Sequence, residues 1–370
     1  MLKLFEVTGF KNLENKLRLD FSDVHSYTFN DACISGGLLK NIIVYGKNAE
    51  GKTNLGIALF DIALHLTSYH KPYIFDDHFY LNANNLMPYV EFHYVFEFST
   101  KKVDYLYRKD KNQTLIYEAV SIDDVLLFAF DYLDQQKSNL IGLKKLLPLL
   151  NLEFRGKVSL LRYAVVNSIL PEDHPLYLMY RFVSRMLWFQ GSDLARFNYM
   201  GYTEDTDNYE QFVINYKLLE EFESFIHQAG IQKHIVEKKQ EYGLKYLYFD
   251  EQVPLPFFKV ASNGTLALHT FFYWYKSAVE LSLLFIDDFD AFYHFEFAET
   301  IVKILEKSNF QTILTSHNTN LLSNRILRPD CYFILSQGKL TSFANSTDRT
   351  LQESHDIENL YISGEFDAYE

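Results

Sequence analysis

The stretch Gly46-Lys47-Asn48-Ala49-Glu50-Gly51-Lys52-Thr53 decides the fold of this chain. It follows the pattern G-x-x-x-x-G-K-[S/T], in which glycines let backbone N–H groups wrap closely around phosphate groups. A helix that begins in this loop adds the favourable field of its N-terminus to the bound negative charge. Lys52 is expected to reach the β- and γ-phosphates of a nucleotide such as ATP, and Thr53 is expected to hold Mg²⁺. The residues expected to contact the nucleotide are Gly46, Asn48, Ala49, Glu50, Gly51, Lys52, Thr53 and Asn54.

The segments on either side of the loop have the structure that such a loop requires. Residues 41–45 read Asn-Ile-Ile-Val-Tyr, an apolar run that predicts a buried strand. Residues 53–69 predict a helix, because their apolar side chains recur at spacings of three and four. A strand, a glycine-rich loop and a helix therefore follow one another, and this context makes a chance match of the loop pattern improbable.

Predicted helices and strands alternate in the last third of the chain. The expected elements are helix 264–280, strand 282–287, helix 294–307, strand 310–315, helix 318–325 and strand 331–335. This alternation predicts an α/β sheet with helices on its faces. Residues 1–21 and 90–120 instead alternate apolar and polar side chains, which predicts short strands and an antiparallel meander.

Residues 121–243 change character and predict a mostly helical insertion. Helical patterns cover 140–150, 176–189 and 209–228. Two short runs, 244–249 and 257–260, predict strands that return the chain to the sheet. The expected organisation is 1–120 as the first half of an α/β domain, 121–243 as the insertion and 244–370 as the second half.

Two carboxylates follow a predicted buried strand, in Leu283-Leu284-Phe285-Ile286-Asp287-Asp288. Ligands of open α/β sheets bind at the carboxyl ends of the strands. Asp287 is therefore expected to bind Mg²⁺ through water, and Asp288 to face an attacking water molecule. A strand that ends in a solvated acidic turn is the plain alternative, and the glycine-rich loop upstream disfavours it.

Two further segments are candidates for phosphate contacts. His317 ends the β-branched run 311–317 and is a candidate sensor of the γ-phosphate, although a histidine after a strand is commonly a loop residue. Ser262 and Gly264 precede the amphipathic helix 266–278, where Ser262 is suited to cap the helix. The alternatives for Ser262 and Gly264 are an ordinary capped helix and a second phosphate site that acts on a neighbouring molecule.

Composition limits the partners and the compartment. The formal net charge is −13, which argues against a broad DNA-coating surface because phosphate binding needs clustered Lys and Arg. Two cysteines, Cys33 and Cys331, are too few for a disulfide framework or a zinc site and fit a reducing cytoplasm. Glu6 interrupts the first apolar run before a signal-peptide core can form, and later runs such as 281–286 are too short to span a membrane.

These motifs, in this order, resemble the ABC-type ATPase heads of the RecF/SMC/OLD superfamily. The resemblance covers roughly 1–110 and 245–345 and is closest to compact AAA-type ATPases of bacterial abortive-infection and phage-defence loci. The loop 46–53 matches Walker A, and Asp287-Asp288 matches Walker B. Ser262-Asn263-Gly264-Thr265 is similar to a divergent signature motif, residues 290–294 to the D-loop, with Asp290 as a nucleotide contact, and His317 to the switch histidine.

The resemblance implies a fold, a cofactor and an assembly. The fold would be α/β, an ABC-ATPase head with a mixed P-loop sheet flanked by helices, an antiparallel β subdomain and a mostly helical insertion. ATP and Mg²⁺ would bind between the P-loop of one protomer and the signature motif of another, so that a homodimer or a higher homo-oligomer closes on ATP and opens after hydrolysis. Lys52, Asp288 and His317 would be the catalytic residues.

Three features depart from the family pattern. Asp288 stands where most relatives have Glu, and a carboxylate displaced by about 1 Å can cost on the order of 100-fold in rate. The signature motif lacks the usual paired glycines. No glutamine is placed as the Q-loop residue, because Gln135 and Gln136 lie far into the insertion.

Several functions stay open at this point. The first is an ATPase switch in anti-phage defence that controls a separate effector, since the chain carries no nuclease motif that we recognise. The second is a DNA-repair or chromosome-associated ATPase, with nucleic acid as a partner of basic residues in the insertion. Those residues are Lys137, Lys144, Lys145, Arg155, Lys157, Arg162, Arg181 and Arg185. The third is a catalytically weak ATP-binding scaffold, and an ATP-binding transporter subunit is the least favoured.

Overall fold

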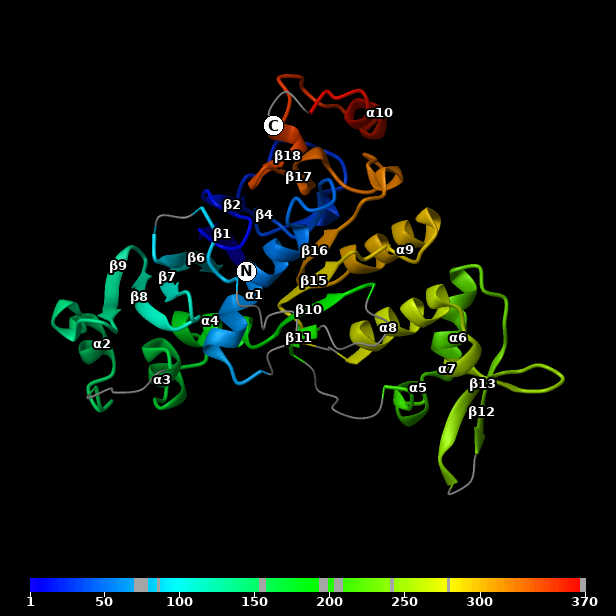
Figure 1. Ribbon diagram of the computed structural model, residues 1–370, viewed down its shortest axis with the longest axis horizontal. Helices are drawn as coiled ribbons and strands as arrows, with labels where there is room; N and C mark the ends of the chain where they lie inside the picture. Colours follow the sequence, from blue (N-terminus) through cyan, green and yellow to red (C-terminus); the bar gives the residue numbers. More distant parts are fainter. Residues whose placement is uncertain are drawn as a thin grey trace.

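A computed structural model of the chain shows two sheets with one helix between them (Figure 1). It describes residues 1–69, 79–84, 87–152, 158–192, 199–202, 209–239, 243–277 and 280–366. The central sheet has seven strands in the order β11-β10-β15-β16-β5-β17-β18. Their bounds are β11 Tyr199–Gly201, β10 Met186–Gln190, β15 Leu283–Asp287, β16 Gln311–Thr315, β5 Asn41–Tyr45, β17 Tyr332–Ser336 and β18 Lys339–Ser342. The five inner strands are parallel and the two edge strands antiparallel, which is a common arrangement in α/β sheets covered by helices.

The second large sheet is antiparallel and has the order β2-β1-β6-β7-β8-β9. Its strands are β1 Leu2–Thr8, β2 Leu17–Asp20, β6 Tyr89–Phe98, β7 Lys101–Asp110, β8 Leu115–Ile122 and β9 Val125–Asp131. One face carries a row of aromatic rings in which Phe92, Tyr94 and Tyr107 stack at centroid distances of 5.0 and 6.0 Å. The predicted strands of residues 1–21 and the predicted meander of 90–120 are confirmed.

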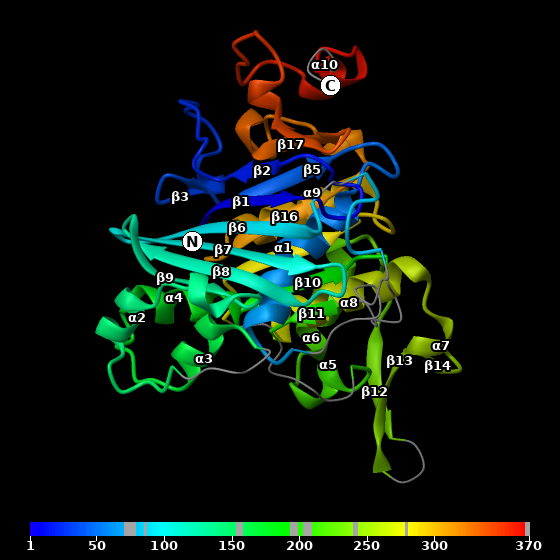
Figure 2. The same ribbon diagram turned by 60° about the vertical axis from the view of Figure 1, so that its left-hand side comes forward.

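Helix α1 (Lys52–Leu66) lies between the two large sheets, behind the antiparallel sheet in the view of Figure 2. Tyr94 of β6 donates its hydroxyl hydrogen to the Ala58 and Leu59 carbonyls from one side. On the other side a Cβ atom on Gly56 would lie 2.6 Å from Trp188 and 2.8 Å from Phe285, so only glycine allows this approach to the central sheet. The sandwich fixes the end of α1 that carries the phosphate-binding loop.

The remaining helices cover the outer surfaces. Figure 1 shows α8 and α9 on the side of the central sheet opposite α1, with α6 packed against α8. The bounds are α2 Ile141–Leu146, α3 Leu160–Val166, α4 Pro175–Val183, α5 Phe212–Asn215, α6 Leu219–Gln228, α7 Phe257–Val260, α8 Asn263–Ser277, α9 Phe295–Glu306 and α10 Ile357–Ile362. Smaller sheets pair β3 (Ile34–Ser35) with β4 (Leu38–Leu39), and β13 (Lys245–Phe249) with β12 (Ile235–Lys239) and β14 (Leu255–Pro256).

Three secondary-structure predictions were wrong. The helix expected over 176–189 ends at Val183, and residues 186–190 form β10 of the central sheet. Residues 257–260, expected as a strand, form α7 because β14 already ends the small sheet at Pro256. The helix expected over 318–325 is a 3₁₀ turn at Thr319–Leu321, with the Asn318 side chain accepting a hydrogen bond from the Asn320 amide.

The segment 121–243 contributes to both large sheets as well as holding helices α2 to α6. Strand β9 extends the antiparallel sheet, while β10 and β11 form one edge of the central sheet. The expected helix over 209–228 is divided into α5 and α6 at Lys217, whose φ of 56° is not helical. The division of the chain at residues 120 and 243 stays a prediction.

The two cysteines, far apart in the sequence, meet in the core. The thiol of Cys331 donates to the sulfur of Cys33 at 3.2 Å, and both thiols are free and buried. Cys33 closes a short 3₁₀ turn and Cys331 precedes β17, so this contact joins the N-terminal region to the central sheet. Within the described residues, no helix has the length and apolar character needed to cross a membrane.

The stability of the antiparallel sheet is expected to depend on the protonation of His93 on β6. Its Nδ1 lies 3.0 Å from Glu6 Oε2 and its Nε2 lies 3.1 Å from Asp104 Oδ1. Burial disfavours the charged imidazole, but the two carboxylates outweigh burial and raise the pKa of His93. Because the folded-state pKa exceeds the unfolded value of about 6.5, protonated His93 stabilises the fold at low pH, and this contribution is lost as the pH rises through the folded pKa.

We therefore expect His93→Gln to destabilise the protein more at pH 6 than at pH 9. Urea unfolding of the wild type and the variant at both pH values measures the difference. His25→Gln, at a half-buried position in the segment after β2, is the matched control. An equal loss at both pH values would mean that His93 acts through packing alone.

Candidate functional site

The loop 46–53 connects β5 to α1 and wraps around the ammonium group of Lys52. The Lys52 Nζ atom donates to the Gly46 carbonyl at 2.8 Å and approaches the Lys47 carbonyl at 3.4 Å. Lys52 is buried, and burial lowers its pKa although the carboxylates of Asp288, Asp287 and Glu50 oppose the shift. The lysine is therefore held in the loop by carbonyl groups that an entering phosphate can replace.

Asn12, from the turn after β1, braces the outside of this loop. Its side-chain amide donates to the Glu50 carbonyl at 2.9 Å, and its Oδ1 accepts from the Asn54 side chain at 2.7 Å. Gly51 has a φ of 106°, and a Cβ atom there would lie 2.5 Å from the Asn12 side chain. Only glycine therefore fits beneath Asn12, which places the turn of residues 9–12 directly over the loop.

Asp287 ends β15 and meets the start of α1. Its Oδ2 accepts from the Thr53 hydroxyl at 2.6 Å, and its Oδ1 accepts from the Thr315 hydroxyl at 2.7 Å. Burial raises the pKa of the Asp287 carboxyl to about 6; the two threonine hydroxyls oppose this shift and the neighbouring Asp288 carboxylate adds to it. The carboxylate is thus fixed between the loop helix and the next strand.

Asp288 and His317 face each other across the mouth of the site. Asp288 has a φ of 48°, a left-handed conformation that Asp tolerates, and its amide donates to Thr315 Oγ1 at 2.8 Å. His317 Nε2 lies 3.9 Å from Asp288 Oδ1. Burial and the nearby Lys52 ammonium lower the pKa of His317 against the pull of Asp288, so the imidazole is neutral at pH 7.

These groups line one pocket of about 440 Å³, which we call the P-loop pocket. Its lining residues are Asn12, Asn48, Ala49, Gly51, Lys52, Thr53, Asn54, Asp288 and His317. A second hollow of about 450 Å³ shares three of them and is lined by Asn48, Asp288, Asp290, Ala291, His317 and Asn318. Small-molecule sites have volumes of this order, and the backbone amides and the Lys52 cation make this one suited to a polyphosphate.

Asp290 lies on the rim of the P-loop pocket, in the second hollow. Its Oδ2 accepts from the Ser316 hydroxyl at 2.8 Å, and burial raises the pKa of its carboxyl despite that bond. Glu50, at the other side, points away from the pocket, because its Oε2 accepts from the amide of Gln337 at 2.7 Å. Gly46 is also not part of the pocket lining, and a Cβ atom on it would lie 2.6 Å from the Leu335 carbonyl oxygen.

Ser262 and Gly264 lie elsewhere in the same chain and are not among the residues that line the P-loop pocket. The Ser262 hydroxyl accepts from the Thr265 amide at 3.2 Å, as expected of the residue that caps α8. A Cβ atom on Gly264 would lie 3.2 Å from the Phe292 carbonyl, and Tyr293 donates to the Ala267 carbonyl at 3.0 Å. The first turn of α8 therefore packs against the segment 290–294 that follows β15.

Sequence reasoning missed three residues of this region. Asn12 gave no signal because its contact with the loop joins residues that are 38 positions apart. Thr315 was part of a noted strand, but its bonds to both Asp287 and the Asp288 amide appear only in three dimensions. Gln190 ends β10 in register with Asp287, and the erroneous helix prediction for 176–189 concealed it. Gln135, by contrast, lies on an exposed 3₁₀ turn after β9.

The donor atoms at the end of β15 fit Mg²⁺. Thr53 supplies a hydroxyl oxygen and Asp287 a carboxylate oxygen, and the two groups are 2.6 Å apart. Mg²⁺ prefers oxygen ligands and commonly combines one or two protein oxygens with water and phosphate oxygens. The site therefore has the chemistry for a Mg-nucleotide rather than for a metal held by the protein alone.

The solved structures that match this chain have low sequence identity to it. An SMC head domain from Thermotoga maritima matches at 11% identity, with 92% of this chain and 98% of that chain covered and a TM-score of 0.45. An Smc head domain bound to the C-terminal domain of ScpA, derived from Pyrococcus furiosus, matches at 10% identity over 92% and 96% with a TM-score of 0.45. The recombination mediator protein RecF with ATP matches at 15% identity over 92% and 99%, with a TM-score of 0.40.

Among curated proteins no match was found. A protein-family model described as "AAA domain, putative AbiEii toxin, Type IV TA system" matches residues 42–323. The matched range begins in β5, just before the phosphate-binding loop, and extends past Asp287, Asp288 and His317. Since this range is well over half of the 370 residues, the chain belongs to this AAA-domain family of P-loop ATPases.

Proposed function

We propose that this chain binds ATP with Mg²⁺ in the P-loop pocket and hydrolyses it. The observation that carries the proposal is the convergence of Lys52, Thr53, Asp288 and His317 on that pocket, with Asp287 fixed behind them. These groups come from α1, β15 and the loop after β16, and α1 is clamped between two sheets. A preorganised set of charges of this kind is what phosphoryl transfer needs from a protein.

Each residue would have a distinct part. The Lys52 ammonium would neutralise charge on the β- and γ-phosphate oxygens, and Asp288 would accept a hydrogen bond from the attacking water and so orient it. The neutral imidazole of His317, 3.9 Å from Asp288, would contact the γ-phosphate region. Mg²⁺, held by Thr53 and Asp287, would supply further positive charge to the phosphates. Gln190, at the end of the neighbouring strand β10, pairs in register with Asp287 and would be the glutamine nearest to this metal ligand in the sheet.

Turnover is expected to be slow. Asp288 is one methylene shorter than the glutamate of most relatives, and a displacement of about 1 Å can cost on the order of 100-fold. A closing partner would bring the water and the carboxylate together. A catalytically weak ATP-binding scaffold is the extreme case of slow turnover. A measurable rate of ATP hydrolysis distinguishes an ATPase from such a scaffold.

The second part of the proposal is a composite site in a homodimer or a higher homo-oligomer. Ser262 and Gly264 stand at the start of α8 but do not line the P-loop pocket of their own chain, so in a head-to-tail dimer α8 would close the pocket of the other protomer. The α8 N-terminus would then contribute backbone N–H groups to the phosphates. ATP binding would close the dimer and hydrolysis would open it.

For the biological role we propose an ATPase switch in bacterial anti-phage defence that acts on a separate effector. The family's description as a toxin of a toxin–antitoxin system supports this role. The alternative of a DNA-associated ATPase has less support, because several of the basic residues have structural partners. Arg162 donates to the Thr67 carbonyl at 2.6 Å, Arg185 pairs with Glu280, and Lys137 pairs with Asp134 at 3.3 Å. Arg155 and Lys157 lie outside the described residues.

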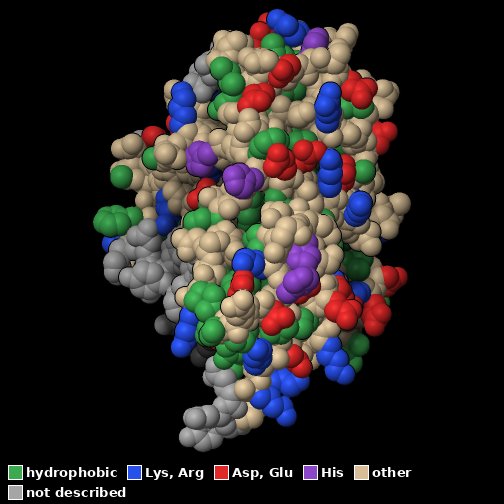
Figure 3. All heavy atoms as spheres, turned by 90° about the vertical axis from the view of Figure 1, so that its right-hand side faces the viewer, with side chains coloured by type: hydrophobic (Ala, Val, Ile, Leu, Met, Phe, Trp, Pro, Cys, Tyr) green, Lys and Arg blue, Asp and Glu red, His purple; other side chains and the backbone are tan. Residues whose placement is uncertain are grey.

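The net charge agrees with this preference. On the face that Figure 3 shows, which is opposite to α2 and α3, acidic and basic side chains are interspersed over the residues drawn in colour. A net charge of −13 adds to the repulsion of nucleic acid. If the protein nevertheless retained DNA at moderate salt in the presence of ATP, the DNA-associated ATPase would become the favoured function.

The first experiment is phosphate release from Mg-ATP by the wild type and by Asp288→Asn. We expect the variant to keep its ATP affinity and to lose turnover by about 100-fold, because the amide cannot accept the water proton or orient the water equally well. Asp348→Asn, exposed and far along the chain, is the matched control. No turnover by the wild type, with ATP still bound, would reduce the proposal to an ATP-binding scaffold.

A second experiment tests the composite site by mixing two inactive variants. Asp288→Asn disables the water-facing residue, and Ser262→Arg places a bulky side chain at the start of α8. In a random equimolar mixture, half of the dimers carry one intact site, so we expect about a quarter of the wild-type activity to return. No recovery would exclude a site shared between protomers, while activity of Ser262→Arg alone would exclude α8 from the site.

A further inference from the structure

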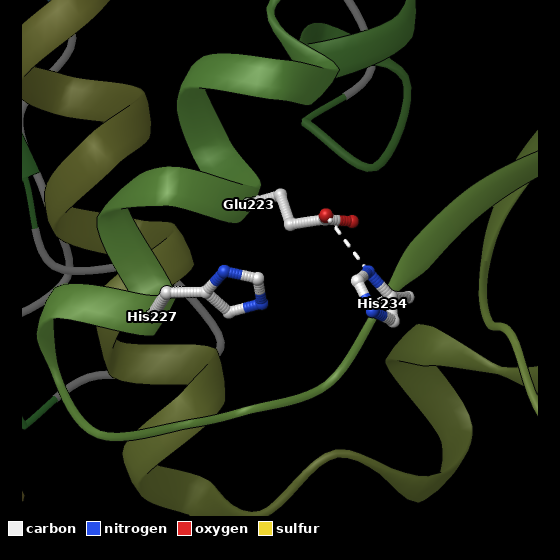
Figure 4. A group of neighbouring side chains, drawn as sticks. All are labelled: Glu223, His227 and His234. Atoms are coloured by element: carbon white, nitrogen blue, oxygen red, sulfur yellow. Dashed lines mark hydrogen bonds and ion pairs between the residues drawn. The ribbon is translucent and has the colours of Figure 1, made fainter.

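Glu223 and His227 of α6 form a cluster with His234, which directly precedes β12, and this cluster lies outside the nucleotide site. One ligand atom from each residue lies within 4.8 Å of the others. Glu223 and His227 are four residues apart on α6 and therefore share one helix face. Figure 4 shows the three side chains directed toward the same space, with His234 reaching it from the loop that leads into β12.

We propose that this cluster is a binding site for one divalent zinc ion. Two imidazole nitrogens and one carboxylate oxygen are ligands that Zn²⁺ accepts, with water as the fourth ligand of a tetrahedron. Harder cations such as Mg²⁺ and Ca²⁺ prefer all-oxygen ligand sets, so two imidazoles disfavour them. The site is independent of ATP, because none of its residues lines the P-loop pocket.

A hydrogen bond fixes the ring of His227 beside the cluster. Its Nε2 lies 3.1 Å from the Lys233 carbonyl, and a carbonyl oxygen can only accept, so this nitrogen donates. A metal ion bound through Nε2 would take the place of this proton. A metal ion bound through Nδ1 would leave the bond to Lys233 intact, as in metal-binding histidines that donate their other N–H to a carbonyl.

Glu223 is held in a similar manner. Its Oε2 accepts from the Ile235 amide at 2.7 Å, which leaves Oε1 directed at the cluster, 3.1 Å from His234 Nδ1. The carboxylate is therefore anchored to β12 through one oxygen and keeps the other for a ligand.

The His234 side chain can move, which allows the three ligand atoms to reach metal-binding distances. The edge of a zinc tetrahedron is about 3.3 Å, so ligand atoms that are up to 4.8 Å apart must approach one another by at most roughly 1.5 Å. The His234 side chain is 76% exposed and can move without disturbing the core, whereas that of Glu223 is 24% exposed and is anchored to β12. Zn²⁺ would replace the hydrogen bond between His234 and Glu223 by two metal–ligand bonds.

Zn²⁺ binding would link α6 to the small sheet of β12, β13 and β14. Helix α6 packs on α8 through contacts such as Phe222 with Phe272 and Phe225 with Phe271, whose ring centroids are 5.2 and 5.9 Å apart. Strands β12 to β14 lead through α7 to Ser262. The ion would therefore join the two elements that hold α8 in place and stabilise the fold against heat, with or without nucleotide.

The test uses the full chain without a histidine tag, stripped with a chelator, and Zn²⁺ alone as the probe. Competition with a chromophoric chelator gives the affinity and the stoichiometry, and thermal unfolding with and without Zn²⁺ gives the stabilisation. We expect one Zn²⁺ per chain, a dissociation constant in the micromolar range or below, and a higher melting temperature. Co²⁺ should give the intense visible absorption of a tetrahedral site.

The variants Glu223→Gln and His227→Ala should each weaken Zn²⁺ binding at least about tenfold and remove the thermal shift. Glu223→Gln keeps the size of the side chain and the acceptor for Ile235, so its fold is expected to be retained. Glu220→Gln on the same helix and His25→Ala elsewhere make the same chemical changes outside the cluster. They should bind Zn²⁺ like the wild type.

Three results would overturn the proposal. These are no saturable Zn²⁺ binding by the wild type, binding of several weak equivalents, and one-to-one binding that Glu223→Gln and His227→Ala leave unchanged. None of these readouts involves ATP. A protein without ATPase activity that still binds one Zn²⁺ through these residues would therefore leave the metal site intact and reject the nucleotide proposal alone.

Discussion

Replacement of Lys52 by alanine is expected to abolish ATP hydrolysis and to weaken ATP binding. Lys52 is the one Lys or Arg among the residues that line the P-loop pocket, so its loss removes the cation that faces the phosphates. Removing one preorganised electrostatic group from an active site typically costs 100- to 1000-fold in rate, and the full charge of an ammonium places this variant at about 1000-fold or more. The measurement is steady-state phosphate release together with equilibrium binding of Mg-ATP.

The position of Lys52 allows a clear distinction between loss of charge and loss of fold. Within the part of the chain that the structure describes, its ammonium donates to carbonyls of its own loop, so removing it breaks no hydrogen bond between the two large sheets. The melting temperature should therefore change little, and Lys303→Ala on the exposed face of α9 should leave both activity and stability unchanged. Wild-type turnover by Lys52→Ala would show that hydrolysis occurs elsewhere in the preparation or the molecule.

Lys52→Arg extends the same test. The guanidinium keeps the positive charge but is larger and planar, and Lys52 is buried inside the loop. We expect Arg to restore little turnover. A large rescue by Arg would mean that charge alone, without a fitted ammonium, is sufficient for this site.

The parts of the site that the sequence predicts are those held by local structure. The strand 41–45, the loop 46–53 and the helix after it are contiguous, and each has its own signal in apolar spacing and glycine placement. Asp287 and Asp288 were predictable for the same reason, because a buried apolar run that ends in carboxylates indicates the carboxyl end of an inner strand.

The missed elements depend on contacts between distant segments. Met186 to Phe189 form a continuous apolar run next to helix α4, and a short run of this kind has no period that separates a buried strand from a helix. Its pairing with β15, about 100 residues later, makes it a strand. Asn12 is similar: a polar residue in an early turn gains its role only when β1 brings that turn over Glu50 and Asn54.

The buried Asp61 carboxylate, which anchors α1 to the antiparallel sheet, also depends on contacts between distant segments. Its removal gives the second large predicted effect. Asp61 of α1 lies between the sheets with its side chain 7% exposed, and its Oδ1 accepts from the buried Lys109 ammonium at 2.5 Å. The hydroxyls of Tyr107 and Tyr80 donate to the same carboxylate at 2.8 and 2.9 Å. Asp61→Ala would leave a buried ammonium and two buried hydroxyls without their common acceptor.

We expect Asp61→Ala to lower the free energy of unfolding by about 3–5 kcal/mol, the usual cost of removing one partner from a buried ion pair. Urea unfolding measures the change. Glu299→Ala, which breaks the exposed pair with Lys303 on α9, should cost no more than about 0.5 kcal/mol.

The double variant Asp61→Leu/Lys109→Met separates the ion pair from packing around it. Replacing both charges by apolar side chains removes the unpaired ammonium, so the double variant should recover much of the stability that Asp61→Ala loses. The tyrosine hydroxyls still lack their acceptor, which keeps the recovery incomplete. If the double variant were as unstable as Asp61→Ala, the buried charge of Lys109 would not be the cause. The support of α1 would then depend on the two tyrosine hydrogen bonds, and with it the position of the loop that carries Lys52.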